Sequence, residues 1–301
     1  MDTNRPNIPV DIIANSLTES CGVQLQLLRL DTLHPVVSGN KWFKLHYNLE
    51  TALQQGHHTL LTFGGAFSNH LVATAAACRE AGLQSIGIVR GDATTPLSPT
   101  LQDCLDLGMT LHWVDRSTYR QKAAPDFLAG LEAQYGPFYL VPEGGDNEAG
   151  VKGAASIMEL VPADTTDICC AMGTGTTLAG LLSTSAPTQH IHGFPAIKQG
   201  DYLAGEVNQY TEGSNFTLHT GYHFGGFGKH TPELLAFMND FYQSFNIPLD
   251  FVYTAKMMYG IFDMLAQRAF EPGAIITAIH SGGLQGNRSL SGKLDWIQQC
   301  F

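Results

Sequence analysis

Ser38-Gly39-Asn40-Lys41-Trp42-Phe43-Lys44-Leu45 is the stretch around which the rest of this chain is organised. Apolar residues recur at helical spacing over residues 42–53 until Gly56 interrupts them, so a helix is predicted to begin beside Lys41. The positive end of a helix dipole favours the neutral form of a nearby amine. A neutral amine is the form in which a lysine attacks an aldehyde and holds it as a Schiff base. Lys41 is therefore the first candidate functional residue.

The composition limits the class of protein. With 301 residues, of which 44% are hydrophobic and 14% charged, the chain is long enough for two lobes and has the balance of a compact fold. A net charge of -11 argues against nucleic acid and anionic membranes as partners. No apolar run approaches the roughly 20 residues that span a bilayer. Residues 1–9 lack the layout of a signal peptide, so a cytoplasmic location is expected.

The cysteines and histidines predict no metal site. The six cysteines are scattered and form no C-x-x-C pair, which favours buried free thiols. The pairs His57-His58 and His190-x-His192 lack the further ligands that a zinc site requires.

Short apolar segments alternate with helical patterns through most of the chain. Strands are predicted over residues 24–30, 59–63, 85–89, 109–114, 138–141, 167–172, 190–194, 216–219 and 274–279. Further helices are predicted over residues 69–80, 98–107, 119–135, 151–161, 177–183, 202–210, 232–245 and 255–269. This alternation is typical of parallel sheets with crossover helices. We therefore expect a two-lobed α/β fold, with parallel or mostly parallel sheets and helices on both faces.

Four predicted strands end in glycine-rich polar turns, and parallel sheets bind ligands at the carboxyl ends of their strands. These turns are Gly64–His70, Glu143–Asn147, Gly173–Thr177 and His280–Gly283. In the third turn, the backbone N–H groups and hydroxyls are suited to holding a phosphate, and its residues are Gly173, Thr174, Gly175, Thr176 and Thr177. The turn matches neither a Walker loop nor the dinucleotide fingerprint, so it indicates a monophosphate.

Ser68-Asn69-His70 begins the alanine-rich helix predicted over residues 69–80. Ser and Asn are common helix N-caps, and the N–H groups and hydroxyl of such a turn also bind carboxylates. The two roles are compatible. Because the chain has no Gly-x-Ser-x-Gly motif, Ser68 is not predicted to be an acyl-transfer nucleophile.

A lysine at a helix start, a phosphate-binding turn and several glycine turns together indicate a pyridoxal-phosphate site. With these motifs the chain resembles the fold type II (tryptophan synthase β-like) pyridoxal-phosphate enzymes, in the family of 1-aminocyclopropane-1-carboxylate deaminase and D-cysteine desulfhydrase. The matching segments occur in the family's order and are Ser38–Leu45, Gly65–His70, Pro142–Gly145, Gly173–Gly180, Asp250–Lys256 and His280–Gly283.

The resemblance implies a role for each candidate residue. Lys41, Ser68 and Tyr253 would be catalytic, and Lys41 would also carry the cofactor. Asn69 would hydrogen-bond the ring hydroxyl, Gly173 to Thr177 would bind the phosphate, and Thr254 would face the pyridine nitrogen. The substrate would be bound by Asn40, Ser68, Asn69 and His70.

The resemblance also implies a domain organisation and an assembly. Residues 1–47 plus 136–301 would form a large cofactor-binding domain, and residues 48–135 a smaller inserted α/β domain. The protein would act on a small amino acid as a homodimer.

Single positions separate the members of this family. The deaminases resemble one another in a glutamate beside the pyridine nitrogen, where this chain has Thr254, and in a leucine where it has Ser281. Both departures favour β-elimination of D-cysteine, or a related D-amino acid, to pyruvate, ammonia and sulfide. Against this, the family's Pro-Gly-Tyr-Gly loop has Phe227 in place of tyrosine, and Phe67 replaces a frequent glutamine.

Three alternatives remain open. The chain would be a 1-aminocyclopropane-1-carboxylate deaminase, or a pyridoxal-phosphate-binding protein with weak catalysis, which Phe67 and Phe227 suggest. A nucleotide-binding α/β protein rests on Gly173–Thr177 alone.

Overall fold

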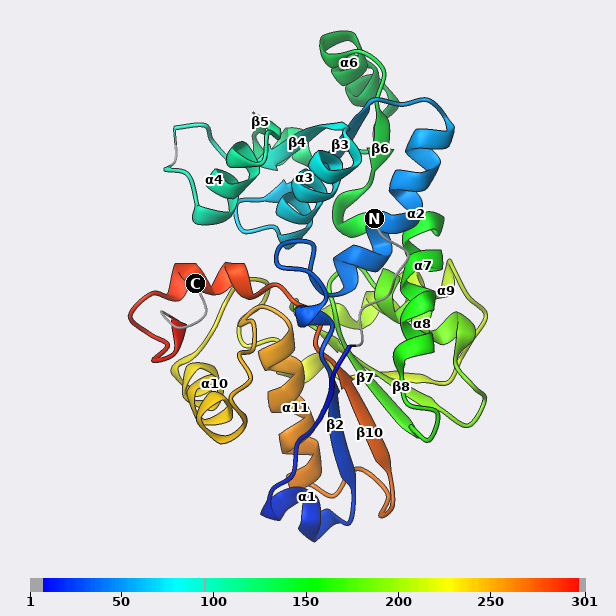
Figure 1. Cartoon of the computed structure of the whole chain (residues 1–301), viewed down its shortest axis with the longest axis vertical. Coiled ribbons are helices and arrows are strands. Elements are labelled where there is room, and N and C mark those ends of the chain that lie inside the picture. The colour runs from blue at the N-terminus through cyan, green and yellow to red at the C-terminus, as the bar shows by residue number, and fades with distance from the viewer. Residues whose placement is uncertain (1–7, 95, 298–301) are drawn as a thin grey trace.

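The computed structural model describes residues 8–94 and 96–297, and these form two groups of elements, each built on a sheet (Figure 1). The larger sheet has the order β1-β2-β10-β7-β8-β9 and the smaller sheet β5-β4-β3-β6. All neighbouring strands are parallel except β1 and β2. The strands are β1 (Val10–Ile12), β2 (Gln24–Leu28), β3 (Thr59–Gly65), β4 (Gln84–Arg90), β5 (Thr110–Val114), β6 (Tyr139–Val141), β7 (Asp167–Met172), β8 (His190–Pro195), β9 (Phe216–Leu218) and β10 (Ile275–Ile279).

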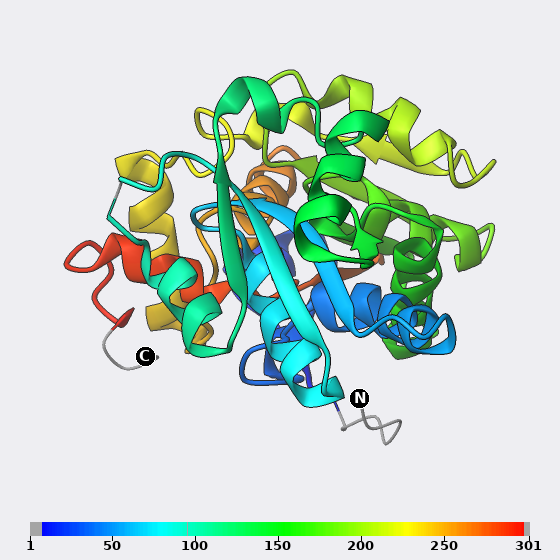
Figure 2. The same cartoon turned by 90° about the horizontal axis from the view of Figure 1, so that it is seen from above.

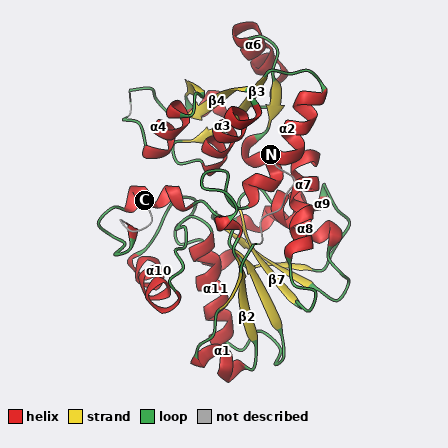
Figure 3. Ribbon diagram, viewed as in Figure 1, coloured by secondary structure: helices red, strands yellow, loops and turns green. Residues whose placement is uncertain are grey.

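Helices surround both sheets, as the ribbon coloured by secondary structure shows (Figure 3). The α-helices are α1 (Ser16–Cys21), α2 (Asn40–Gln54), α3 (Asn69–Ala81), α4 (Pro99–Asp106), α5 (Arg116–Tyr119), α6 (Pro125–Tyr135), α7 (Glu148–Ala155), α8 (Thr176–Thr184), α9 (Leu203–Asn208), α10 (Pro232–Phe245) and α11 (Thr254–Ala266). The 3-10 helices are η1 (Leu30–Thr32), η2 (Glu143–Gly145), η3 (Ser156–Leu160), η4 (Gly200–Tyr202), η5 (Thr220–Tyr222) and η6 (Leu284–Leu290).

The larger sheet is buried on both faces, because successive side chains of a strand point to opposite sides. In β7, Cys169 and Ala171 pack with residues of α10 and α11. The alternate residues of the same strand, Ile168 and Cys170, pack with residues of α7 and α8. Because both of its faces are buried, β7 is apolar almost throughout, and its sequence shows no alternation of apolar and polar residues.

The smaller sheet is also covered on both faces, and it lies in front of the larger sheet when the molecule is seen from above (Figure 2). Leu61 and Phe63 of β3 pack with residues of α5 and α6. On the other face, Leu60 packs with α2 and α3. Helix α2 also packs on α7, which follows the smaller sheet in the chain, so it joins the two groups.

The predicted elements are mostly present, with three differences. The helix predicted over residues 119–135 is confirmed only from Pro125 onward: α5 ends at Tyr119 and α6 begins at Pro125, because proline fits the first turn of a helix and not its interior. The helix predicted over residues 151–161 becomes η3 from Ser156 onward. The short elements β1 and α1 were not predicted, since six residues or fewer carry little periodicity.

The domain boundaries stay a prediction, and the strand pairing bears on one of them. Strand β6 pairs with β3 in the smaller sheet, although its residues lie beyond the expected boundary at residue 135. Residues 1–7 and 298–301 of the predicted larger domain lie outside the described residues.

The described cysteines Cys21, Cys78, Cys104, Cys169 and Cys170 are free and buried, as predicted, and Cys300 lies outside the described residues. Within residues 8–94 and 96–297, none of the helices has the length and apolar character to cross a membrane.

Candidate active site

The four glycine-rich turns meet at one cavity between the two sheets. Each turn follows a strand at its carboxyl end: β3, β6, β7 and β10. The cavity has a volume of about 370 Å³ and is lined by residues of both groups of elements. It brings together all of the predicted site residues except the side chains of Thr176 and Thr254.

Lys41 is the second residue of α2, and its side chain opens into this cavity. Its Nζ donates a hydrogen bond to Asn40 Oδ1 at 3.2 Å. Burial lowers the pKa of Lys41 to about 8, although the carboxylate of Asp250 opposes the change. A measurable fraction of the amine is therefore neutral near neutral pH, which is the nucleophilic form.

Lys44 lies three residues further along α2 and also lines the cavity, and the sequence analysis gave it no role. Its exposed fraction is only 3%, and its Nζ donates to the carbonyl oxygen of Gly144 at 3.2 Å. Burial and the charge of Lys41 hold the pKa of Lys44 well below its ordinary value, while Asp146 opposes them. Its signal in the sequence is its position three residues after Lys41, which puts both lysines on one face of the helix.

The turn Gly173–Thr177 joins the end of β7 to the start of α8. Gly175 has a φ of +92°, a conformation that favours glycine. The first N–H groups of a helix have no partner inside the helix, and together with the helix dipole they bind anions. The backbone of this turn is therefore suited to a phosphate, as predicted.

The threonine hydroxyls of this turn have different hydrogen-bond partners. The hydroxyl of Thr176 donates to Asp146 Oδ1 at 2.7 Å and lies 2.7 Å from the hydroxyl of Thr174. The hydroxyl of Thr177 accepts a hydrogen bond from Asn40 Nδ2 at 2.9 Å. Asn40 thus connects Lys41 to the turn, and the side chain of Thr176 fixes the turn from behind without lining the cavity.

Helix α3 begins at the cavity with the predicted N-cap. The hydroxyl of Ser68 accepts a hydrogen bond from the N–H of Leu71 at 3.3 Å. Next to it, Asn69 Oδ1 is buried and has no hydrogen-bond partner among the described residues. His70 is buried, and its Nε2 lies 2.9 Å from the hydroxyl of Thr62. Burial and the charges of Lys41 and Lys44 hold the pKa of His70 well below its ordinary value, so its imidazole is neutral.

The start of α11 is organised by Asp250, which the sequence analysis did not single out. This buried carboxylate accepts the N–H groups of Val252, Tyr253 and Thr254 at 3.0, 2.9 and 2.8 Å. Residues 251–253 form a turn that this carboxylate stabilises.

Tyr253 and Thr254 occupy different places at this helix start. The hydroxyl of Tyr253 packs on Gly173, where an added Cβ would lie 3.1 Å from it. Burial and the nearby carboxylates of Asp250 and Glu143 raise the pKa of Tyr253 far above its ordinary value, so its hydroxyl stays protonated. The hydroxyl of Thr254 is buried and has no hydrogen-bond partner among the described residues.

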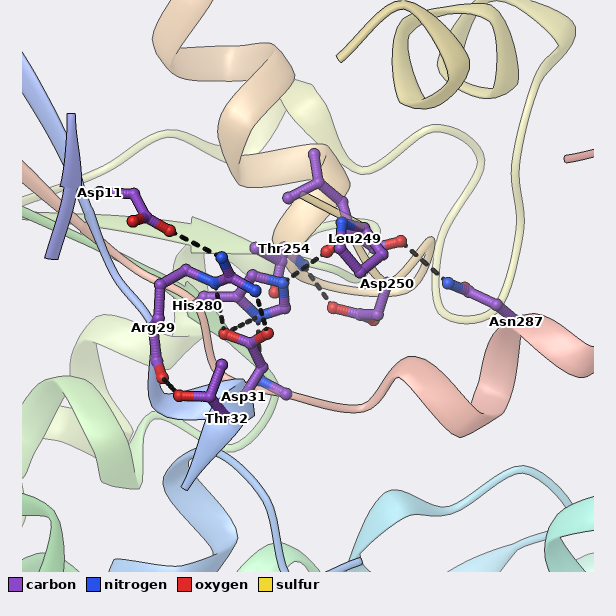
Figure 4. A network of polar contacts seen from close by, with 11 residues as sticks. Asp11, Arg29, Asp31, Thr32, Leu249, Asp250, Thr254, His280 and Asn287 are labelled. Carbon is purple, nitrogen blue, oxygen red and sulfur yellow. Dashed lines mark hydrogen bonds and ion pairs between the residues drawn. The ribbon is translucent and has the colours of Figure 1, made fainter. Parts of the chain in front are cut away.

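A network of buried charges supports the last glycine turn from below (Figure 4). Arg29 donates to both carboxylate oxygens of Asp31 at 2.8 Å and to Asp11 at 2.7 Å. Asp31 also faces His280 at 3.7 Å, and His280 bonds the carbonyl oxygen of Pro248 at 2.7 Å. Burial acts to raise the pKa of Asp31, but His280 and Arg29 outweigh it and hold the pKa below its ordinary value.

The backbone of that turn lies directly against the start of α2. A Cβ added to Gly39 would lie 1.8 Å from the carbonyl oxygen of Ser281, so only glycine fits there. Gly39 also has a φ of +66°, which favours glycine independently of space. The network of Asp31 and His280 therefore stabilises the turn that packs against Gly39, at the start of the helix that carries Lys41.

The fold and the cavity define an α/β protein in which a lysine with a lowered pKa and an anion-binding turn line one cavity. The chain matches the pyridoxal-phosphate dependent enzyme family over residues 7–282, and it belongs to that family. The predicted family, the two-lobed fold type II architecture and pyridoxal phosphate as the cofactor are thereby confirmed.

Particular relatives agree with this assignment. The chain is 28% identical to a D-cysteine desulfhydrase of Klebsiella pneumoniae over 292 residues, which cover 89% of each chain. It is 29% identical to a bifunctional D-cysteine desulfhydrase/1-aminocyclopropane-1-carboxylate deaminase, mitochondrial, of Arabidopsis thaliana, over 88% of this chain and 73% of that protein. A solved structure of an ACC deaminase homologue superposes with a TM-score of 0.81 and 25% identity, over 98% of this chain and 93% of the other.

Proposed function

We propose that this protein is a pyridoxal-phosphate-dependent lyase that removes the β-substituent of a small amino acid, with D-cysteine as the substrate and pyruvate, ammonia and sulfide as the products. The observation that carries the choice of reaction is Thr254, a neutral residue where the deaminases have a glutamate. The D-cysteine desulfhydrase among the relatives supports the same choice.

The residues of the cavity fit pyridoxal phosphate. Two buried oxygens, Asn69 Oδ1 and Thr254 Oγ1, have no partner in the described part of the chain. Such groups are rare in folded proteins, and a bound ring with a hydroxyl and a nitrogen would satisfy them. The N–H groups of Gly173–Thr177 and the amine of Lys44 would hold the phosphate, whose negative charge would also return Lys44 to its protonated form.

The cofactor and the protein divide the chemistry between them. When bound, pyridoxal phosphate withdraws electrons and so stabilises negative charge on the α-carbon of the substrate. Lys41, whose pKa burial lowers to about 8, would hold the cofactor and would be the group that accepts the α-proton of the substrate. Ser68 and the N–H groups of α3, together with Asn40, Asn69 and His70, hold and orient the substrate.

Tyr253 is suited to acting on the leaving group. Tyr253 lines the cavity and its hydroxyl stays protonated, so it would donate a hydrogen bond to the departing sulfur. This assignment gives the leaving group a hydrogen-bond donor although Phe227 lacks a hydroxyl.

The assembly, location and domain boundaries are further parts of the proposal. The protein would be a cytoplasmic homodimer, with residues 1–47 plus 136–301 as the larger domain and residues 48–135 as the inserted one. Sedimentation of the purified protein would measure its mass in solution, and a mass equal to one chain would contradict the dimer.

The test of the proposed reaction is a product assay on the purified enzyme supplied with pyridoxal phosphate. Sulfide and pyruvate are expected in equal amounts from D-cysteine, with much less from L-cysteine. Production of 2-oxobutanoate from 1-aminocyclopropane-1-carboxylate would instead show the deaminase. Spectral changes with amino acids but no product from any of them would favour the weakly catalytic alternative that Phe227 suggests.

A further inference from the structure

The rim of the active-site cavity is unusually aromatic. Within the described residues, the exposed large apolar side chains are Ile12, Leu53, Phe67, Leu97, Leu105, Tyr202 and Phe227. The three aromatic members, Phe67, Tyr202 and Phe227, all line the active-site cavity. Single exposed apolar side chains are ordinary, but several around one cavity indicate a binding surface.

The aromatic side chains come from both sides of the cavity. Phe67 follows β3 of the smaller sheet and is 45% exposed. Phe227 lies in a glycine-rich loop of the larger group and is 47% exposed. The ring of Phe227 packs edge-on against Tyr253, with ring centres 6.0 Å apart. Ile197 adds an aliphatic side chain to the same lining.

The loop that presents Phe227 is held firmly. Lys256, one turn after Tyr253 on α11, donates to the carbonyl oxygens of His223 and Gly226 at 2.9 Å. Its exposed fraction is 2%, so these bonds are made inside the protein. These hydrogen bonds hold the backbone of the loop, and the loop places the ring of Phe227 in the cavity wall.

The charged side chains that line the cavity from the smaller sheet already have partners. Glu143 pairs with Lys122 at 3.0 Å. The guanidinium of Arg90 lies 5.5 Å from the centre of the Tyr119 ring, in cation–π contact. The charged groups are thus engaged within the protein, whereas the aromatic side chains at the rim keep about half of their surface exposed.

We propose that the substrate carries an apolar or aromatic group on its β-sulfur, so that the enzyme is a lyase of S-substituted cysteines that releases a thiol. This inference rests on the proposed function. The α-proton is removed and the Cβ–S bond breaks, and the thiolate leaves with the bonding electrons and takes up a proton. Water then converts the remaining three-carbon fragment to pyruvate and ammonium, and no oxidant or reductant is needed.

The test compares D-cysteine with S-benzyl-D-cysteine on the holoenzyme. A hydrophobic pocket distinguishes substrates by roughly tenfold or more for each small apolar group, so kcat/KM for the benzyl thioether is expected to be at least about tenfold higher. In Phe67→Ala and Phe227→Ala this ratio is expected to fall several-fold. Leu105→Ala, which removes an exposed apolar side chain that does not line the cavity, should retain the ratio and serves as the control. A thioether that reacts more slowly than D-cysteine would overturn the inference.

A binding measurement separates this inference from the proposed function. D-phenylalanine and D-alanine have no sulfur to lose, and their dissociation constants can be read from the visible spectrum of the holoenzyme. The aromatic amino acid is expected to bind at least about tenfold more tightly, and this preference should weaken in Phe67→Ala. If neither sulfur substrate gives pyruvate but this preference holds, the lyase is wrong and the apolar site stands. If D-cysteine reacts but the two amino acids bind equally, the lyase stands and the apolar site is wrong.

Discussion

Two buried polar regions lie near the active site, one beneath the last glycine turn and one at the starts of α3 and α11, and they differ in how completely their groups are paired. In the network of Asp31, Arg29 and His280, each side chain faces a partner within 3.7 Å. At the starts of α3 and α11, beside the cavity, Asn69 Oδ1 and Thr254 Oγ1 are buried with no partner in the described part of the chain. The polar groups of both regions are buried, so burial alone does not explain the difference in pairing.

The difference separates groups that stabilise the fold from groups that bind. Burying a polar group without a partner costs free energy, and almost all such groups in proteins are paired. The paired network stabilises the turn beneath Lys41, whereas the unpaired oxygens and the two buried lysines lower the stability of the protein without its cofactor. Substitutions in the paired network should therefore destabilise the protein, whereas substitutions of the unpaired groups should not, and the following predictions test this.

The largest effect is expected from Asp31→Asn. The substitution leaves Arg29 and His280 facing a neutral group inside the protein, and breaking a buried pair costs about 3–5 kcal/mol of unfolding free energy. Chemical denaturation of the two proteins measures it. Asp11→Asn is the control, because the Asp11 side chain is 40% exposed and exposed pairs contribute about 1 kcal/mol or less. Equal losses in the two variants would show that the network is not the stabilising unit.

Lys41→Met should stabilise the cofactor-free protein by about 1–2 kcal/mol, because it removes a buried amine whose pKa is lowered to about 8. The sign depends on pH. Below about pH 8 the amine is charged in both the folded and the unfolded protein, so the full cost of burying the charge applies. Between about pH 8 and 10.5 only the unfolded chain keeps the proton, so wild-type stability rises and the advantage of Lys41→Met shrinks. A variant that is less stable than wild type at pH 7 would contradict this.

Asn69→Ala should change the stability of the cofactor-free protein by less than about 0.5 kcal/mol, because Asn69 Oδ1 has no partner to lose within the described residues. The dissociation constant for pyridoxal phosphate should rise about tenfold, since one hydrogen bond contributes about 1.4 kcal/mol or slightly less. Fluorescence titration and thermal unfolding measure the two quantities. A large loss of stability with unchanged cofactor affinity would assign Asn69 to the structural region instead.

The smallest effect is a shift in a pH profile. The rate at which pyridoxal phosphate attaches to the cofactor-free protein should increase with pH and level off near pH 8, the pKa of Lys41. Because Asp250 raises that pKa, Asp250→Asn should move the levelling point to lower pH. Absorbance stopped-flow experiments follow the attachment. A profile that continues to rise toward the pKa of an ordinary lysine would contradict the burial of Lys41.

Local sequence patterns predicted the parts of the fold that local physics determines. The strand Asp167–Met172 and the helix Pro232–Phe245 have the predicted bounds, the first through its apolar run and the second through Thr231 and Pro232 at its start. The meeting of the four glycine turns followed from the rule that parallel sheets bind at their carboxyl ends.

The remainder depends on contacts between distant segments, which a single sequence does not reveal. Asp31 meets His280 from the other end of the chain, so the network was not predicted. Lys44 was not distinguished from a surface lysine because its burial comes from the packing of α2 between the two groups of elements. Thr176 was placed correctly in the turn, but its bond to Asp146 directs its hydroxyl away from the cavity.

The most direct test is the visible absorption spectrum of the purified protein with pyridoxal phosphate, for wild type and Lys41→Ala, followed by borohydride reduction and peptide mass spectrometry. The account predicts a yellow wild-type protein that borohydride bleaches, with the pyridoxyl group found on Lys41. It predicts no such band in the variant. A label on Lys44 in the wild-type protein, or an unchanged band in Lys41→Ala, would contradict the assignment of Lys41 and the mechanism built on it.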